Sequence, residues 1–374
     1  MADSSHLAAL VAWLAFALAF VFGAVANRVN FCTMGAITDV VHVGDWRRMR
    51  MWMLAIAVAI AGAAVLEAAG LIDLSKTIYT TPRIAWLSYL VGGFLFGFGM
   101  TLASGCGSKT LIRLGGGSLK SLVVLIMLAI SAYMTLKGLF GVWRVNALDV
   151  VRWDVAPLGM SRSDLGSVAA RLSGGGAAIR LGVALAIAAA IAVFVFSSRD
   201  FRSSRELAIG GIVIGAVIVG GWYVTGHLGY VAEDPKTLEE AFVATNSGRA
   251  ESYSFVAPTA YLLELLLLWS DQSKLVTFGI AGVLGMAAGS AAMALATGAF
   301  RWEGFASTED LVNHIVGGVL MGFGGVTALG CTIGQGLTGI STLAFGSALA
   351  LAAIVTGCVA ALKYQYWRLE SVAG

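Results

Sequence analysis

The chain has 374 residues, of which 58% are hydrophobic and only 12% are charged. Soluble domains carry about 45–50% apolar and about 25% charged residues, so this composition excludes a soluble globular protein. The net charge of +3, without a Lys/Arg cluster, gives no reason to expect a nucleic-acid partner. We therefore expect an all-α polytopic membrane protein whose outer surface contacts lipid.

Apolar stretches follow one another along the chain at lengths typical of membrane helices. A helix that spans a bilayer needs about 20 predominantly apolar residues. The segment before the first stretch, 1-MADSSH-6, has no basic residue, so we interpret the first stretch as a retained helix rather than a signal peptide. The predicted spans are 7–26, 51–71, 84–105, 119–140, 177–196, 207–226, 273–297, 311–330 and 341–362.

Two of these spans resemble each other in sequence. The segments 91-VGGFLFGFGMTLASGC-106 and 316-VGGVLMGFGGVTALGC-331 share ten of sixteen residues without a gap, at an offset of 225. Glycine-rich membrane segments also align by chance, but both copies of this one end on a cysteine. We therefore predict an internal duplication. A shorter match, between 32-CTMG-35 and 331-CTIG-334, is too short to establish a relationship by itself.

The arginines give the relative direction of the two copies. If residues 84–118 form one broken helix that crosses the membrane, the copies run in opposite directions. The arginines of 47–50 and 197–206 then share one side, and the acidic loop 227–257 lies on the other. Short basic loops mark the cytoplasmic side. The alternative, in which 84–118 enters and returns, makes the copies parallel and scatters the arginines over both faces. The first arrangement is an inverted repeat, which is typical of transporters.

The predicted organisation is a single transmembrane transporter domain. It has an inverted internal repeat, broken helices and Cys/Gly loops that plunge inward. Its parts are repeat one at about 7–140, linking spans at 141–257 and repeat two at about 258–362, within a domain of 1–374. We expect this domain to lie in a bacterial inner (cytoplasmic) membrane with several passes.

The four cysteines are far apart and have neither C-x-x-C nor metal-ligand spacing, so we expect no metal or cofactor. Cys106 and Cys331 are followed by glycine-rich segments that interrupt the helix, since glycine costs about 1 kcal/mol in a helix interior. Unwound backbone is tolerated at membrane depth only beside protein or a water-filled cavity. Cys32 lies in a polar interruption after the first span. Cys358 lies inside an apolar run, and we interpret it as a packing residue.

A short helix that begins after a break offers free backbone N–H groups and the positive end of its dipole to an anion. Lys109 and Arg113 follow Cys106 and strengthen this reading, although Lys109 could instead snorkel to a lipid headgroup. Copy two has no cation in 332–341, so the two halves are not expected to bind charge equally. Glu67 and Glu264, within apolar runs, are candidate proton-coupling groups, and we expect Glu264 to face water.

At these loops the sequence resembles the YeeE/YedE family of membrane proteins, whose characterised members take up thiosulfate. The residues that carry the resemblance are 30-NFCTMGA-36, 104-SGCGSKTLIRLGGGSLKSL-122 and 329-LGCTIGQGLTGIS-341. The resemblance implies an inverted-repeat helical fold, three functional cysteines that pass thiosulfate along by weak S–H contacts, and a small TusA-like sulfur-carrier protein on the cytoplasmic side. The implied substrate-pathway residues are Cys32, Thr33, Gly105, Cys106, Gly107, Ser108, Lys109, Arg113, Gly330, Cys331, Thr332 and Gln335.

Two classes of function follow from these residues. The first is uptake of thiosulfate or a related inorganic sulfur anion, because a thiol is a weak donor suited to a sulfur acceptor. The second is a membrane-embedded sulfurtransferase or redox enzyme that forms a cysteine persulfide, for which Lys109 would stabilise a thiolate. No histidine base lies in these loops, so transport without enzymatic chemistry is the preferred hypothesis. The family label also covers proteins linked to selenium, so a selenium compound is an alternative substrate.

Overall fold

The computed structural model describes residues 2–234, 238–271 and 273–373. Within these residues, eight helices are long and apolar enough to cross a membrane. The protein is therefore a helical, multi-pass membrane protein, and the predicted fold class is confirmed. The predicted span at 311–330 forms a helix but falls outside this set of eight, because Glu309, Asp310 and His314 lie in its first two turns and lower its hydropathy.

Long helices alternate with short helices and two small strand pairs. The helices are α1 (Ala2–Arg28), α2 (Thr33–Thr38), α3 (Arg47–Ala68), α4 (Trp86–Leu102), α5 (Gly107–Gly115), α6 (Leu119–Lys137), α7 (Leu139–Trp143), α8 (Leu165–Ser173), α9 (Ala177–Phe196), α10 (Arg199–Ser203), α11 (Arg205–Tyr223), α12 (Ala257–Leu267), α13 (Phe278–Ala296), α14 (Thr308–Thr327) and α15 (Phe345–Ala373). The shorter helical turns are η1 (Asp39–Val43), η2 (Leu74–Lys76), η3 (Arg144–Leu148), η4 (Ala156–Leu158), η5 (Val224–Leu228) and η6 (Gly334–Gly339). The antiparallel strand pairs are β1 (Arg83–Ile84) with β2 (Trp153–Asp154), and β3 (Tyr230–Val231) with β4 (Ala241–Phe242).

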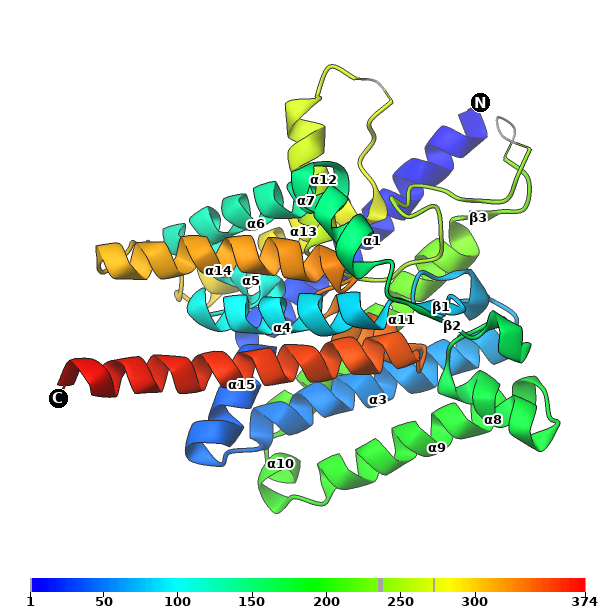
Figure 1. The fold of residues 1–374 in the computed structure, drawn as a ribbon, viewed down its shortest axis with the longest axis horizontal. Helices are drawn as coiled ribbons and strands as arrows, with labels where there is room; N and C mark the ends of the chain where they lie inside the picture. Colours follow the sequence, from blue (N-terminus) through cyan, green and yellow to red (C-terminus); the bar gives the residue numbers. More distant parts are fainter. Residues whose placement is uncertain (1, 235–237, 272, 374) are drawn as a thin grey trace.

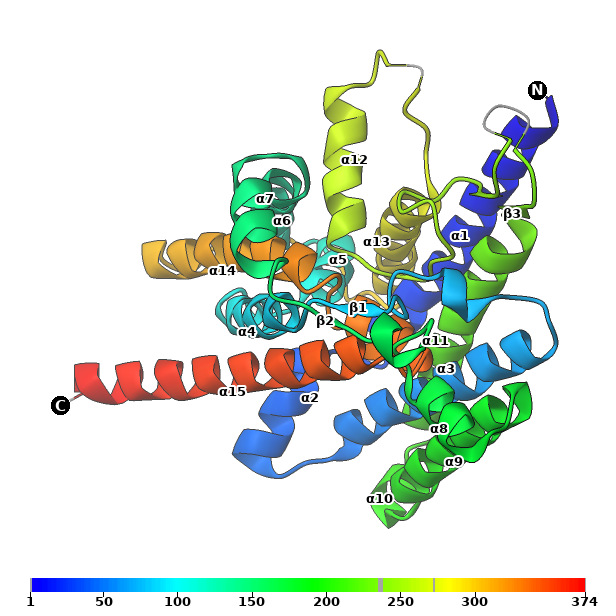
Figure 2. The ribbon, with the colours of Figure 1, turned by 45° about the vertical axis from the view of Figure 1, so that its right-hand side comes forward.

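Helix α4 packs between α14 and α15 (Figure 1), and α12 stands across them (Figure 2). Local sequence explains where such helices begin. Ser307 caps α14 by accepting a hydrogen bond from Asp310 N at 3.1 Å, and the acidic residues of the first turn face the positive end of the helix dipole. Helix α12 begins with Pro258 in its first turn, where proline costs no hydrogen bond.

The two arginine-rich segments lie at the same end of the molecule, as predicted. Arg50, near the start of α3, donates hydrogen bonds to Val195 O at 3.0 Å and Ser197 Oγ at 3.2 Å, beside the end of α9. At the other end of α3, Leu71 O lies 3.1 Å from His227 Nδ1, in the segment that leads to the acidic loop. The arginines and the acidic loop are therefore at opposite ends of the helix bundle.

The two copies of the repeated segment, α4 and α14, pack antiparallel through matched glycines. A Cβ at Gly92 would lie 2.8 Å from Gly324 O, and a Cβ at Gly324 would lie 2.6 Å from Gly92 O. The pair Gly99 and Gly317 shows the same reciprocal contact, at 2.8 and 2.6 Å. At the offset of 225, Gly92 of α4 is equivalent to Gly317 of α14, and Gly99 is equivalent to Gly324. The contact between Gly92 and Gly324 is therefore equivalent to the contact between Gly317 and Gly99. An inverted repeat predicts this pattern of contacts.

Candidate substrate pathway

The chain takes the same turn before each of three cysteines. Asn30, Ser104 and Leu329, each two residues before a cysteine, have left-handed backbone with φ of 51°, 56° and 57°. The residue after each of them donates its N–H to a carbonyl five residues earlier in the preceding helix, at 2.8 to 2.9 Å. Left-handed backbone costs a non-glycine residue about 1–2 kcal/mol. The same turn thus precedes each of the three cysteines that the sequence places at helix breaks.

After the turn, Cys32 and Cys106 stand immediately before a short helix, and Cys331 stands three residues before the start of η6. Cys32 caps α2, and its Sγ accepts a hydrogen bond from Gly35 N at 3.3 Å. Cys331 has the corresponding bond from Gly334 N, at 3.4 Å. Cys106 is the residue before α5, with its Sγ 3.2 Å from Ser108 Oγ. The predicted helix breaks are therefore confirmed, and the short match between 32–35 and 331–334 corresponds to a shared cap geometry.

The three thiols are buried, and none of them is in a disulfide within the described residues. Cys32 is 7% exposed, Cys106 is 1% exposed and Cys331 is fully buried. Cys106 interacts electrostatically with Cys32 and with Cys331. The structure thus brings the three cysteines singled out in the sequence into one buried region, with Cys106 within electrostatic reach of the other two.

Lys109 links the first two cysteine loops. Its side chain is half-buried, and its Nζ donates a hydrogen bond to Asn30 Oδ1 at 2.5 Å. It also interacts electrostatically with both Cys32 and Cys106. Lys109 therefore points into the protein beside the thiols and does not snorkel to a headgroup. Arg113 makes a different contact. Its Nη1 donates a hydrogen bond to Ser104 O at 2.9 Å, and this bond stabilises the left-handed turn before Cys106.

Buried polar atoms without a protein partner gather in the cysteine loops and next to them. Within the described residues, Thr33 Oγ1, Thr332 Oγ1 and Gln335 Oε1 have no hydrogen-bond partner. Burying a polar group without a partner costs about 1–3 kcal/mol. These atoms belong to residues expected in the pathway, and each is free to meet a polar ligand. The remaining predicted pathway residues, Gly105, Gly107, Ser108 and Gly330, are buried in the same loops.

Two residues of α3 join this region without a signal in the sequence. The Trp52 ring packs on η6, where a Cβ at Gly336 would lie 2.8 Å from it, and its buried indole N–H has no partner among the residues that the structure describes. Arg48 packs under α2, where a Cβ at Gly35 would lie 2.6 Å from its guanidinium, and it pairs with Asp39 at 2.5 Å. The sequence suggested only that Arg48 marks the cytoplasmic side, because no pattern connects α3 to the cysteine loops.

Cys358 differs from the other three cysteines in its backbone. It lies within α15, a helix that continues unbroken from Phe345 to Ala373, and it is fully buried. The Thr101 hydroxyl of α4 donates to its Sγ at 3.3 Å. Cys358 interacts electrostatically with Cys32 and Cys106 and is thus at similar depth, yet it stands at no helix terminus.

Comparison with known proteins agrees with this arrangement. Residues 28–360 match the protein family described as sulphur transport. The chain belongs to the sulphur transport family. It is 27% identical to the thiosulfate transporter TsuA of Spirochaeta thermophila over 92% of this chain and 96% of that protein. It is 26% identical to the thiosulfate transporter TsuA of Escherichia coli over 94% of each chain. The resemblance to the YeeE/YedE family is confirmed.

Proposed function

We propose that the protein imports thiosulfate across the bacterial inner membrane and passes it along Cys331, Cys106 and Cys32. The observation that carries this proposal is the set of three buried thiols, each shortly before a helical segment and after the same strained turn. The two curated relatives that are named thiosulfate transporters support the choice of substrate.

The chemistry of the loops suits a sulfur oxyanion. Thiosulfate has a soft terminal sulfur that accepts weak S–H donors, and three oxygens that accept ordinary hydrogen bonds. The thiols would meet the sulfur, while the unpaired hydroxyls of Thr33 and Thr332 and the indole N–H of Trp52 would meet the oxygens. Successive weak sites favour passage, because an ion that binds too tightly does not leave.

The inverted repeat and the orientation belong to the same proposal. The reciprocal glycine contacts of α4 and α14 support two copies related by an axis in the membrane plane. The arginine-rich end would face the cytoplasm, where Arg48 lies beside the loop of Cys32. A TusA-like sulfur carrier that receives thiosulfate would dock at this end. The Cys331 loop would then face the outside.

Growth on defined sulfur sources tests this function. Cells that lack their other sulfur permeases should grow on thiosulfate as the sole sulfur source when they express this protein, and should accumulate labelled thiosulfate. No growth and no accumulation, with the protein present in the membrane, would contradict thiosulfate import. Growth on a selenium compound instead would favour the selenium alternative.

The membrane-embedded sulfurtransferase is the second candidate. Its specific support is Lys109, which interacts electrostatically with Cys106 and could stabilise a thiolate there. In this enzyme the Cys106 thiolate would attack the terminal sulfur of thiosulfate, the S–S bond of thiosulfate would break and sulfite would leave. The resulting persulfide on Cys106 would be detected by mass spectrometry of the protein isolated under thiosulfate. An unmodified Cys106 in actively transporting cells would favour import without covalent chemistry.

A further inference from the structure

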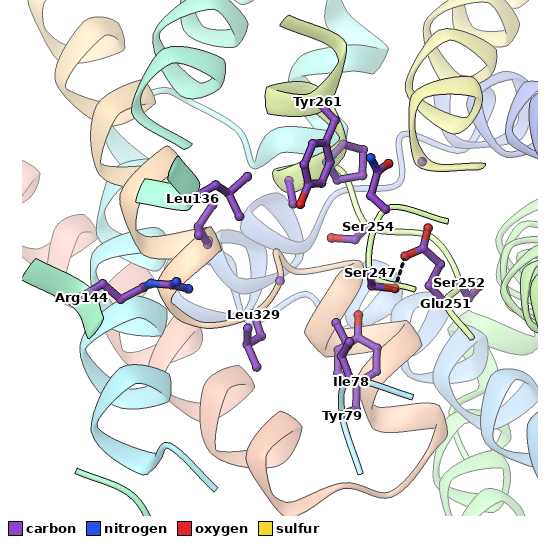
Figure 3. Close-up of a pocket in the computed structure, with 17 residues that line it drawn as sticks. Ile78, Tyr79, Leu136, Arg144, Ser247, Glu251, Ser252, Ser254, Tyr261 and Leu329 are labelled. Atoms are coloured by element: carbon purple, nitrogen blue, oxygen red, sulfur yellow. Dashed lines mark hydrogen bonds between the residues drawn. The ribbon is translucent and has the colours of Figure 1, made fainter. Parts of the chain in front are cut away.

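A cavity of about 210 Å³ lies next to the Cys331 loop (Figure 3). Its wall includes Leu329 and Gly330, the two residues immediately before Cys331. Tyr79, on another side of the cavity, interacts electrostatically with Cys331. The cavity therefore adjoins the outermost thiol of the proposed pathway.

Two ionisable side chains lie on opposite sides of this cavity (Figure 3). Arg144 of η3 is mostly buried; its Nε forms an ion pair with Asp149 at 3.6 Å but has no hydrogen-bond partner within the described residues. Glu251, in the segment before α12, is half-buried and accepts a hydrogen bond from Ser247 Oγ at 2.8 Å. A cation and a carboxyl group thus face the same space without being paired to each other.

A second cavity, of about 420 Å³, shares Asn246 and Tyr261 with the first. Its wall carries Lys137, Lys274 and Glu264. The buried Glu264 carboxylate accepts hydrogen bonds from Lys137 at 2.8 Å and Lys274 at 2.7 Å, so the group has a net positive charge. The expectation that Glu264 faces water is wrong, because these two lysines cover it. The net positive charge of Lys137, Lys274 and Glu264 would attract anions toward the first cavity, beside the Cys331 loop, which we call the inner cavity.

We propose that the inner cavity is an entrance site that binds a divalent sulfur oxyanion together with one proton, with Arg144 facing the anion and Glu251 taking the proton. The proton comes from the solution outside the membrane and binds a carboxylate oxygen of Glu251, and no covalent bond to the anion forms. This inference rests on the proposed function, since it concerns the same substrate on its way to Cys331.

The charge balance of the cavity requires the proton. An ionised Glu251 would repel a dianion held in the same small space, whereas the neutral acid can donate a hydrogen bond to it. Burial raises the pKa of Glu251 from 4.5 to about 7. The pH dependence of anion binding in this cavity therefore depends on Glu251 and not on the other ionisable groups near it. Burial raises the pKa of Tyr79 and Tyr261, which stay neutral, whereas the hydrogen bonds from Lys137 and Lys274 outweigh burial and lower the pKa of Glu264. Asp149 is the ion-pair partner of Arg144, at 3.6 Å.

Uptake at two pH values tests the proposal. A group with a pKa of about 7 is protonated about ten times more often at pH 6 than at pH 8. Initial uptake of labelled thiosulfate at low concentration should therefore be about tenfold faster at pH 6, and Glu251→Gln should remove this dependence. Glu240→Gln is the matched control, because Glu240 lies in the same loop, pairs with Lys76 and does not line the cavity.

The proton can also be counted on the wild-type protein, which avoids any effect of a substitution on folding. Calorimetric titration of purified protein with thiosulfate at pH 8, in buffers of different ionisation enthalpy, should show uptake of about one proton per anion. Binding without proton uptake, or a Glu251→Gln variant with the wild-type pH ratio, would overturn the proposal and leave thiosulfate import standing. Absence of thiosulfate uptake at both pH values would instead contradict the proposed function.

Discussion

The loops that hold Cys106 and Cys331 have the same backbone but different charge. Both follow a left-handed residue and precede a helical segment. Lys109 follows Cys106, and at the offset of 225 its counterpart is Gly334. A Cβ at Gly334 would lie 2.6 Å from Ser254 Oγ, so the second loop has no room for a long side chain. Packing therefore keeps the Cys331 loop free of a cation.

This difference gives the proposed pathway a direction. The proposed duplication accounts for the two similar thiol turns, and Lys109 would make the Cys106 loop more attractive to an anion than the Cys331 loop. Intramembrane cations are costly and normally face a pathway. A dianion that leaves the neutral Cys331 loop would next meet the Cys106 loop with Lys109, which also contacts Asn30 in the turn before Cys32. Substitutions of Cys106, Lys109 and Cys358 distinguish whether transport depends on the backbone turn that both loops have or on the charge of Lys109, which the Cys331 loop lacks.

Removal of the central thiol should have the largest effect. Cys106→Ala removes the weak donor and the polarizable sulfur at the point where both other thiols interact, so we expect thiosulfate uptake to fall to background. The lost packing is one buried atom, which costs about 1 kcal/mol and leaves the fold intact. Labelled uptake, normalised to the amount of protein in the membrane, is the measurement. Substantial uptake by this variant would show that the shared turn does not need its thiol.

Removal of Lys109, the cation that the Cys331 loop lacks, should weaken uptake without abolishing it. Interactions with a charged group contribute about 1.5–3 kcal/mol, so Lys109→Ala should raise KM about tenfold or more, while the backbone N–H groups of α5 still face the anion. Lys109→Arg keeps the charge and is the matched control. A variant with unchanged KM would mean that the charge difference between the two loops has no role in substrate binding.

Cys358→Ala should have the smallest effect. Cys358 is a buried cysteine close to the same region but on the unbroken helix α15, so its substitution tests whether burial alone makes a thiol functional. We expect uptake within about twofold of wild type, in line with a packing role. Loss of transport at normal protein levels would contradict the link between helix breaks and function.

Sequence patterns predicted the features that depend on local chemistry. Apolar length gave most of the membrane helices, the glycines after Cys106 and Cys331 gave the helix breaks, and the arginines of 47–50 and 197–206 gave the shared end of the bundle. Each of these signals lies within one short segment. The strained turns were not predictable in the same way, because Ser104 and Leu329 occupy left-handed positions where glycine is the usual residue.

Features that depend on tertiary contact could not be predicted. Trp52 and Arg48 lie on α3, and only the packing of α3 against η6 and α2 brings them to the cysteine loops. The cavity beside Cys331 is similar, since Arg144 and Glu251 come from segments with no recognisable motif. The ion pairs of Glu264 depend on Lys137, which is 127 residues away in the chain. None of these contacts leaves a periodic pattern in the sequence.

The most direct test of the central claim is uptake by Cys106→Ser. Serine restores a hydrogen-bond donor and nearly the same shape, but its oxygen is harder and more strongly solvated than sulfur. If the thiol meets the terminal sulfur of thiosulfate, labelled uptake by this variant should stay close to that of Cys106→Ala, at normal protein levels. Uptake equal to wild type would contradict the claim and make the turn a general anion gate that needs only a donor.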